Sequence, residues 1–240
     1  MTHIAEIYRE HPLLWAWIVG SAGLAAGSFL QLAAVRIPAG LSVIEPPSRC
    51  DSCGHRLGFF DLVPVLNYFF LRGRCRHCRH PFSPLHPFAE AVCGVSFFLL
   101  ALRFGFHAEL AVALLLFCIL FVAAWTDLTH RIIPDKVILF GMIVAIPLRI
   151  WTHPEPLWSY AVAFVSGSGV LVFIDACTRK VFGKEGVGGG DIKLFAWLGL
   201  VLGWELTLAA LLISSLLGLV GGSIVLSLSP DKEHHRYIPF

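Results

Sequence analysis

Charged residues are scarce in this chain, since Asp, Glu, Lys and Arg together make up only 14% of its 240 residues. A soluble globular domain usually carries about 25% charged residues. Hydrophobic residues make up 57% of the sequence instead, and the mean hydropathy is +0.76. This composition excludes a soluble fold with a single anchor and predicts an all-α polytopic membrane protein.

The sequence shows no evident cleavable signal peptide and no disulfide scaffold. Residues 1–11 lack the basic n-region of a secretory signal, and the apolar run that follows is longer than a signal h-region, so we expect the first span to stay in the protein. Cysteine is too sparse for a disulfide scaffold, because the chain has only seven. Four of them form two C-x-x-C pairs, which indicate a metal site in a reducing compartment.

Hydrophobic runs predict about seven membrane spans, separated by short polar or proline-rich links. Small residues from Gly20 to Ser28 line much of the first span and predict a close helix–helix interface. The expected spans are 13–35, 88–102, 110–126, 137–150, 157–176, 194–202 and 206–228. The expected regions are a first membrane helix at 1–36, a cytoplasmic insertion at 37–87, a helix bundle at 88–229 and a cytoplasmic tail at 230–240.

Basic residues are distributed unevenly between the two sides of these spans. If the N-terminus is outside, the inner segments contain 15 of the 18 basic residues, and the outer segments contain Arg9, Arg103 and Arg149. Cytoplasmic loops carry an excess of Lys and Arg. The sequence therefore predicts an outer N-terminus, with the insertion, Asp127 and Asp191 on the cytoplasmic side.

The insertion at 37–87 is too short for a generous hydrophobic core, so we expect a staple within it. Cys50 and Cys53 form one C-x-x-C pair, and Cys75 and Cys78 form another after 21 intervening residues. This separation predicts a zinc-ribbon-like, four-thiolate zinc site, which is closed to other ligands and therefore structural. Redox pairs or disulfides are the alternative, and a cytoplasmic location argues against them.

The other histidines and cysteines have simpler interpretations. The histidines beside the two pairs are expected on the surface rather than as ligands, namely His55, His77, His80 and His86. The cysteines in the spans are expected to be small buried apolar residues, namely Cys93, Cys118 and Cys177.

Acidic residues at the edges of the spans form a second candidate site, because an acid that enters hydrocarbon is costly and usually functional. Asp127 ends the third expected span, and Asp191 follows Gly188, Gly189 and Gly190 at the start of the sixth. Glycines allow unusual backbone conformations and close approach of another chain. The alternative for Asp191 is a flexible loop followed by a helix N-terminus, where Asp complements the dipole. Each aspartate alone is also compatible with a helix cap or a buried salt bridge.

If the bundle brings Asp127 and Asp191 together, they form a carboxylate dyad. Two close carboxylates cannot both ionise easily, so one keeps a proton. The ionised one takes a proton from water while the other polarises a carbonyl oxygen. This chemistry is peptide hydrolysis without a covalent intermediate. Of the other acids, Asp135 is expected to face a helix dipole, and Glu90 and Asp175 are expected to be structural partners of nearby Arg residues.

Several motifs together resemble the bacterial type IV prepilin leader peptidases, which are membrane aspartic proteases of the GxGD class. The motifs extend over nearly the whole chain and are Gly27-Ser28-Phe29-Leu30, Arg36-Ile37-Pro38, Pro47-Ser48-Arg49-Cys50, Leu71-Arg72-Gly73-Arg74-Cys75, Asp127-Leu128-Thr129-His130-Arg131-Ile132-Ile133-Pro134-Asp135 and Gly188-Gly189-Gly190-Asp191-Ile192-Lys193. The resemblance implies that Asp127 and Asp191 are the catalytic pair. It also implies that the protein cleaves the basic leader from type IV prepilins or type II secretion pseudopilins at the cytoplasmic membrane face.

The family resemblance further implies S-adenosylmethionine-dependent N-methylation of the new N-terminal residue. It implies a membrane-embedded precursor as substrate and a location in the bacterial inner membrane with a periplasmic N-terminus. No familiar S-adenosylmethionine loop is visible, so no residue is assigned to that cofactor, and no nucleic-acid partner is expected. Family members usually continue past Phe240 into an eighth span, so we expect a further span there.

Two other functions are compatible with parts of the sequence. Intramembrane acids also occur in ion- or proton-coupled transporters, although the zinc insertion and the absence of an evident inverted repeat weigh against a transporter. A non-catalytic zinc-ribbon membrane scaffold of a secretion system is the third possibility.

Overall fold

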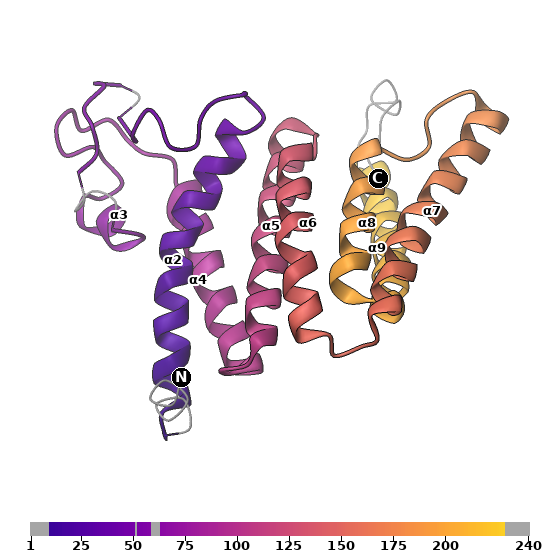
Figure 1. Ribbon diagram of the computed structural model, residues 1–240. Coiled ribbons are helices and arrows are strands. Elements are labelled where there is room, and N and C mark those ends of the chain that lie inside the picture. Colours follow the sequence, from indigo (N-terminus) through magenta and orange to yellow (C-terminus); the bar gives the residue numbers. More distant parts are fainter. Residues whose placement is uncertain (1–9, 51, 59–62, 229–240) are drawn as a thin grey trace. The chain divides into compact units, whose positions relative to one another are not determined.

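The structure is a computed structural model that describes residues 10–50, 52–58 and 63–228. In these residues the chain is all-α, with isolated β-bridges and no strand, which confirms the predicted fold class (Figure 1). The helices are α2 (Pro12–Arg36), α3 (Leu66–Phe70), α4 (Leu85–Phe104), α5 (Ala108–His130), α6 (Asp135–Thr152), α7 (Leu157–Phe182), α8 (Gly189–Leu202) and α9 (Trp204–Leu228).

Every apolar segment that the sequence predicts as a span falls on one of these helices. Within the described residues, α2, α4, α5, α7 and the Trp204–Ile224 part of α9 are long and apolar enough to cross a membrane. α6 carries Asp135, Lys136 and Arg149 in 18 residues. α8 has only 14 residues, about 21 Å of helix against a hydrocarbon core of about 30 Å. The chain is therefore a multi-pass membrane protein, with α6 and α8 as its less typical segments.

The chain forms two compact units, Met1–Val137 and Ile138–Phe240. In the first unit, α2 packs closely against α4 through glycines on both helices. A Cβ atom added at Gly23 would lie 2.6 Å from the Cβ atom of Phe97, and one added at Gly27 would lie 2.8 Å from the Cα atom of Glu90. The helix–helix interface that the small residues predict is confirmed, because only glycine leaves room for this approach.

The second unit is built around α8, which packs against α7. A Cβ atom added at Gly199 would lie 2.4 Å from the carbonyl group of Ala163, so the two backbones are in direct contact. At the carboxyl end of α8, Arg149 is buried, and its Nε donates to the Val201 carbonyl oxygen at 2.7 Å. Its guanidinium also lies 5.2 Å from the centre of the Tyr160 ring. A cation at this position complements the helix dipole and satisfies a free carbonyl group.

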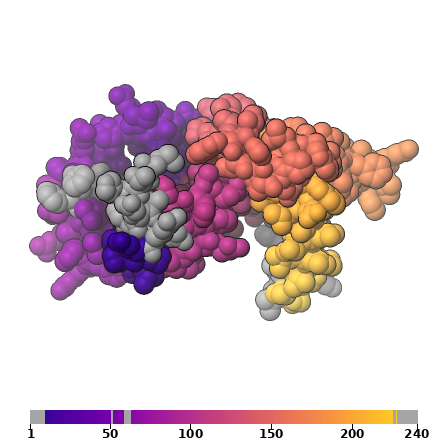
Figure 2. All heavy atoms as spheres, turned by 60° about the horizontal axis from the view of Figure 1, so that its bottom comes forward, coloured from indigo at the N-terminus to yellow at the C-terminus, as the bar shows by residue number. Residues whose placement is uncertain are grey.

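The second half of α9 extends away from α7 and α8 (Figure 2). Its residues from 212 to 221 are all exposed, and most of them are apolar. Large side chains among them include Leu212, Leu216 and Leu219, each at least 62% exposed. In a membrane protein an apolar surface of this kind is stable only against lipid or another helix.

Candidate functional site

Asp191 lies in the first turn of α8. Gly188 is the N-cap residue, and its carbonyl oxygen accepts hydrogen bonds from the Asp191 and Ile192 amides at 3.1 and 3.3 Å. The helix begins at Gly189, five residues before the expected start of the span at 194, so the glycine stretch is mostly helix. The alternative interpretation, in which an acid complements the dipole at a helix N-terminus, therefore describes the local geometry of Asp191 correctly.

The glycines before Asp191 provide space rather than an unusual backbone. Gly188 has φ −64° and ψ 137°, and none of residues 188–190 has a positive φ. A Cβ atom added at Gly188 would lie 3.0 Å from Oδ2 of Asp191, while one added at Gly189 would meet nothing within 4 Å. The Asp191 carboxylate thus folds back toward Gly188 and leaves slightly less than the usual room for a Cβ atom there. The backbone of these residues therefore needs no conformation that is reserved for glycine.

Asp127 lies in the last turn of α5, which continues past the expected end at 126 to His130. Arg131 ends the helix in the left-handed conformation, with φ 56° and ψ 38°, and its amide donates to the Asp127 carbonyl oxygen at 2.8 Å. The Asp127 side chain is exposed, whereas its neighbour Thr126 is fully buried. The helix end thus presents the Asp127 carboxylate at the surface of the first unit.

The other acids singled out from the sequence have structural contacts. Asp175 is buried and forms an ion pair with Arg179 at 2.7 Å, as expected. Asp135 lies in the first turn of α6, also as expected. Glu90 is buried on α4 and accepts a hydrogen bond from the Val65 amide at 2.7 Å, so its partner there is a backbone group of the insertion.

The two cysteine pairs form matching knuckles in the insertion. The Cys50 amide donates to the His55 carbonyl oxygen, and the Cys75 amide donates to that of His80, both at 2.9 Å. In each knuckle the residue after the second cysteine is left-handed, with φ 68° at Gly54 and 58° at Arg79. One bridge closes each turn, Arg49 with Arg56 and Arg74 with Pro81.

The four cysteine sulfurs converge on a single point. The Sγ atoms of Cys50, Cys53, Cys75 and Cys78 all lie within 4.8 Å of one another, and those of Cys50 and Cys78 are 3.7 Å apart. Zinc–sulfur bonds of about 2.3 Å in a tetrahedron place sulfurs about 3.8 Å apart. Backbone amides of Cys53 and Ser52 lower the pKa of the Cys50 thiol to about 7, whereas desolvation and the neighbouring thiols raise the pKa of Cys53 to about 11. The donor set and its spacing fit a zinc ion.

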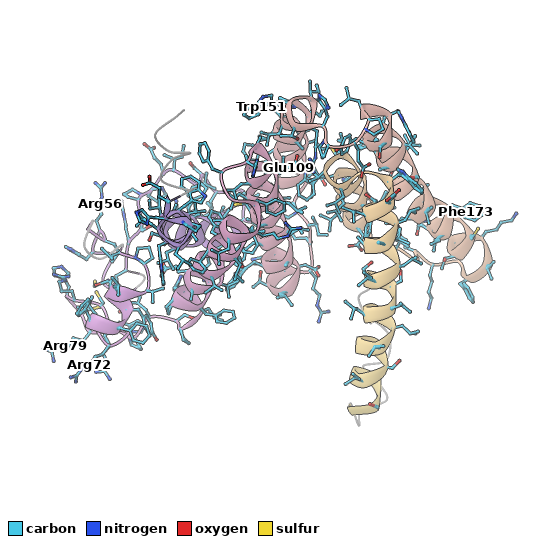
Figure 3. The ribbon with its side chains drawn as sticks, turned by 90° about the horizontal axis from the view of Figure 1, so that it is seen from below. Arg56, Arg72, Arg79, Glu109, Trp151 and Phe173 are labelled. Carbon is cyan, nitrogen blue, oxygen red and sulfur yellow. The ribbon has the colours of Figure 1, made fainter. Side chains whose placement is uncertain are left out.

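Side chains around this cluster are solvent-exposed. The rings of His55 and His77 lie against each other, with their centres 3.6 Å apart and their planes tilted by 39°. All four histidines expected on the surface are exposed. The insertion also presents exposed arginines, including Arg56, Arg72 and Arg79 (Figure 3).

The cysteines outside the cluster differ from one another. Cys93 is buried and Cys118 is half-buried, but Cys177 on α7 is exposed, so the expectation of burial is wrong for Cys177. It lies near the carboxyl end of α7, where the side chains from 176 to 182 are exposed or half-buried.

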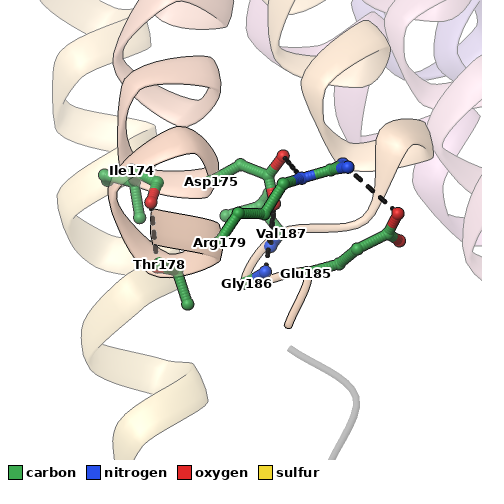
Figure 4. A network of polar contacts seen from close by, with 7 residues as sticks. All are labelled: Ile174, Asp175, Thr178, Arg179, Glu185, Gly186 and Val187. Carbon is green, nitrogen blue, oxygen red and sulfur yellow. Dashed lines mark hydrogen bonds and ion pairs between the residues drawn. The ribbon is translucent and has the colours of Figure 1, made fainter. Parts of the chain in front are cut away.

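Sequence reasoning missed the partners of Asp175 and Glu90 in the loops. The Gly186 and Val187 amides donate to Asp175 Oδ1 at 3.0 and 3.3 Å (Figure 4). Every residue except proline has the same backbone amide, so the sequence does not indicate which amides bind these carboxylates. For Asp175 the only signal in the sequence is the arginine four positions later, at the spacing of a helical ion pair.

Comparison with known proteins places both candidate sites within matched regions. A model described as bacterial peptidase A24 N-terminal domain matches residues 21–104, which include the cysteine cluster. A model described as type IV leader peptidase family matches residues 114–223, which include Asp127 and Asp191. No solved structure matches this chain.

Curated relatives named prepilin leader peptidase/N-methyltransferase align with most of the chain. One from Myxococcus xanthus (strain DK1622) is 38% identical over 85% of this chain and 61% of its own length. One from Bacillus subtilis (strain 168) is 36% identical over 85% of this chain and 81% of its own length. One from Klebsiella pneumoniae is 31% identical over 88% of this chain and 96% of its own length. The chain thus spans about three fifths of the M. xanthus relative and most of the other two, and it belongs to the type IV leader peptidase family.

Proposed function

We propose that this protein cleaves the leader peptide from membrane-embedded prepilins or pseudopilins, and that Asp127 and Asp191 are its catalytic pair. The observation that carries the proposal is that one peptidase-family match, residues 114–223, contains both aspartates. Each one stands at a helix end, in the last turn of α5 and in the first turn of α8. The uneven distribution of basic residues supports a cytoplasmic location for the two helix ends that carry these aspartates.

The proposed reaction is hydrolysis by a dyad in which the two carboxylates share one proton. The ionised carboxylate removes a proton from a water molecule, and the water oxygen attacks the carbonyl carbon of the scissile peptide bond. The protonated carboxylate donates to the carbonyl oxygen as negative charge develops there. The C–N bond then breaks, and the leaving amine takes up the proton that the first carboxylate removed from the water. Neither aspartate forms a covalent bond to the substrate.

We also propose that the protein N-methylates the amine that cleavage exposes, with S-adenosylmethionine as the methyl donor. The support is the name prepilin leader peptidase/N-methyltransferase that the three relatives described above share. We assign no residue of this chain to that cofactor. The proposed role of the cysteine cluster is separate: a zinc ion bound by four thiolates has no open position, so it stabilises the insertion.

The proposed location is the bacterial inner membrane, with the N-terminus in the periplasm and the dyad facing the cytoplasm. A membrane-embedded precursor would then approach sideways through the lipid and present its cleavage site at the cytoplasmic face. The proposed regions are the first helix at 1–36, the zinc insertion at 37–87, the catalytic bundle at 88–229 and a cytoplasmic tail at 230–240.

The test is mass spectrometry of a purified prepilin that has been incubated with the protein in lipid. We expect loss of the leader mass, and a further methyl group when S-adenosylmethionine is added. Asp127→Asn and Asp191→Asn should each abolish cleavage, because Asn can neither accept nor donate the proton. Asp135→Asn, which changes an acid in the first turn of α6, is the matched control and should cleave normally. Normal cleavage by either dyad variant would contradict the assignment.

A further inference from the structure

A buried carboxylate on α7 holds the loop that leads into α8. Asp175 is 7% exposed and lies two turns before the end of α7. The loop after Gly183 turns back along these last turns, and its Gly186 and Val187 amides donate to Asp175 Oδ1 (Figure 4). The other oxygen, Oδ2, accepts a hydrogen bond from Arg179 Nε at 2.7 Å. Three donors therefore converge on this single carboxylate.

The rest of this loop lies close to α7 as well. A Cβ atom added at Gly186 would lie 2.6 Å from the Cβ atom of Thr178, so the loop backbone touches the helix. Arg179 also reaches Glu185 at 3.3 Å, although that glutamate is 73% exposed. Solvent screens the ion pair between Arg179 and the exposed Glu185, whereas the Asp175 carboxylate is buried and its hydrogen bonds are screened less.

The chain between this contact and Asp191 has no side chain to fix it. Val187 is followed by Gly188, Gly189 and Gly190, and Asp191 comes next. Gly188 is the N-cap residue of α8, and Gly189 and Gly190 are its first two residues. Because glycine has the largest backbone freedom of any residue, these positions do not by themselves fix the direction of that first turn. The nearest fixed point before Asp191 is the pair of amides bound to Asp175, four and five residues away.

We propose that Asp175 is a positioning residue for Asp191, acting through the Gly186 and Val187 amides. The carboxylate fixes the loop on α7, the loop fixes the first turn of α8, and that turn carries the Asp191 carboxylate. Arg179 holds the Asp175 side chain in the rotamer that this contact requires. Asp175 does not touch the substrate. The expected effect of Asp175 on cleavage rests on the proposed function, whereas its expected effect on the loop does not.

The first test is amide hydrogen exchange of the full-length protein in lipid, which needs no activity. Asp175→Ala should speed exchange at Gly186 and Val187 about tenfold or more, because hydrogen bonds to a charged group are among the stronger ones. The increase should be confined to residues 183–192. Unchanged exchange in this loop would overturn the proposal. Faster exchange throughout α7 and α8 would also overturn it, since Asp175 would then stabilise the whole unit rather than the loop.

The second test is the cleavage rate of a series of variants. Asp175→Ala should lower kcat about tenfold to a hundredfold with little change in KM, because displacement of a catalytic group by about 1 Å has effects of this size. Asp175→Asn should restore part of the rate, since its carbonyl oxygen still accepts from the two amides while its NH₂ group faces Arg179. Glu185→Gln, an acid-to-amide change on the exposed side of the same network, is the control and should change kcat by about twofold or less.

The outcomes of the two tests separate this inference from the proposed function. Inactive wild-type protein would count against the function, and hydrogen exchange would still decide the inference. If the wild type cleaves and Asp175→Ala cleaves equally well, the inference is wrong while the function stands. If Asp175→Asn is as inactive as Asp175→Ala despite normal loop exchange, Asp175 acts by its charge on the reaction and not by positioning.

Discussion

The space above Gly188 leads to a specific prediction about Asp191. A Cβ atom at position 188 would lie 3.0 Å from Asp191 Oδ2, and ordinary van der Waals contact begins at 3.4 Å, so the carboxylate must move by about 0.4 Å. Displacement by about 1 Å can cost about a hundredfold in rate, so we expect Gly188→Ala to lower kcat about fivefold to tenfold. The assay is the initial rate of leader cleavage in lipid at saturating precursor.

The neighbouring glycine is a matched control for this substitution. A Cβ atom at Gly189 meets nothing within 4 Å, and its helical backbone accepts alanine. Gly189→Ala should therefore cleave like the wild type. Gly188→Ala also removes a favourable N-cap residue, and Gly188→Ser separates the two effects because serine caps the helix but still carries a Cβ atom. A slow Gly188→Ser variant supports displacement of the carboxylate. Normal cleavage by Gly188→Ala would refute the reasoning.

Two further predictions concern the cysteine cluster. Cys50→Ser should leave the purified protein without stoichiometric zinc by elemental analysis and should lower its unfolding temperature, because the binding free energy of a structural zinc, about 10–16 kcal/mol, is also folding free energy. Cys177→Ser, at an exposed thiol on α7, should keep the zinc, and a full zinc content in Cys50→Ser would contradict the four-thiolate site. Gly54→Ala should cost about 1 kcal/mol, or about fivefold in zinc affinity measured by competition with a chelator, since position 54 has φ 68° and nothing within 4 Å. An unchanged affinity in Gly54→Ala would mean that the left-handed turn is not needed for metal binding.

Hydropathy and motif spacing correctly predicted the positions of most helices and of the two cysteine knuckles. Continuous apolar runs of about 20 residues have the length of a membrane helix and are longer than a membrane β-strand, so helices were expected at 13–35 and 157–176. The knuckles were predictable because a tetrahedral thiolate site fixes the spacing within each C-x-x-C pair. The start of α8 at Gly189 was not predictable, because glycine has a low helix propensity and a run of glycines does not indicate where a helix begins.

Contacts between side chains and backbone groups lay beyond the sequence pattern. Glu90 binds the Val65 amide across 25 positions, and Arg149 binds the Val201 carbonyl oxygen across 52. Any residue type presents the same amide or carbonyl group, so no pairing of residue types indicates these bonds. The charge distribution identified Arg149 only as one of the basic residues on the outer side of the membrane. Its burial at the carboxyl end of α8 goes with its hydrogen bond to Val201 and its contact with the Tyr160 ring on α7.

The two interpretations of Asp191 that the sequence left open describe one geometry. As the third residue of α8, Asp191 complements the helix dipole and the free amides of the first turn, which favours an acid at that position for stability alone. The same position lets its carboxylate lie over Gly188, where no side chain occupies the space. A stabilising acid needs no empty neighbour, because a Cβ atom on the N-cap residue is common in helices. Glycine is a favourable N-cap residue, but serine caps a helix at least as well, so helix stability does not require a bare position at 188. The comparison of Gly188→Ser with Gly189→Ala therefore tests whether the Asp191 carboxylate needs that space.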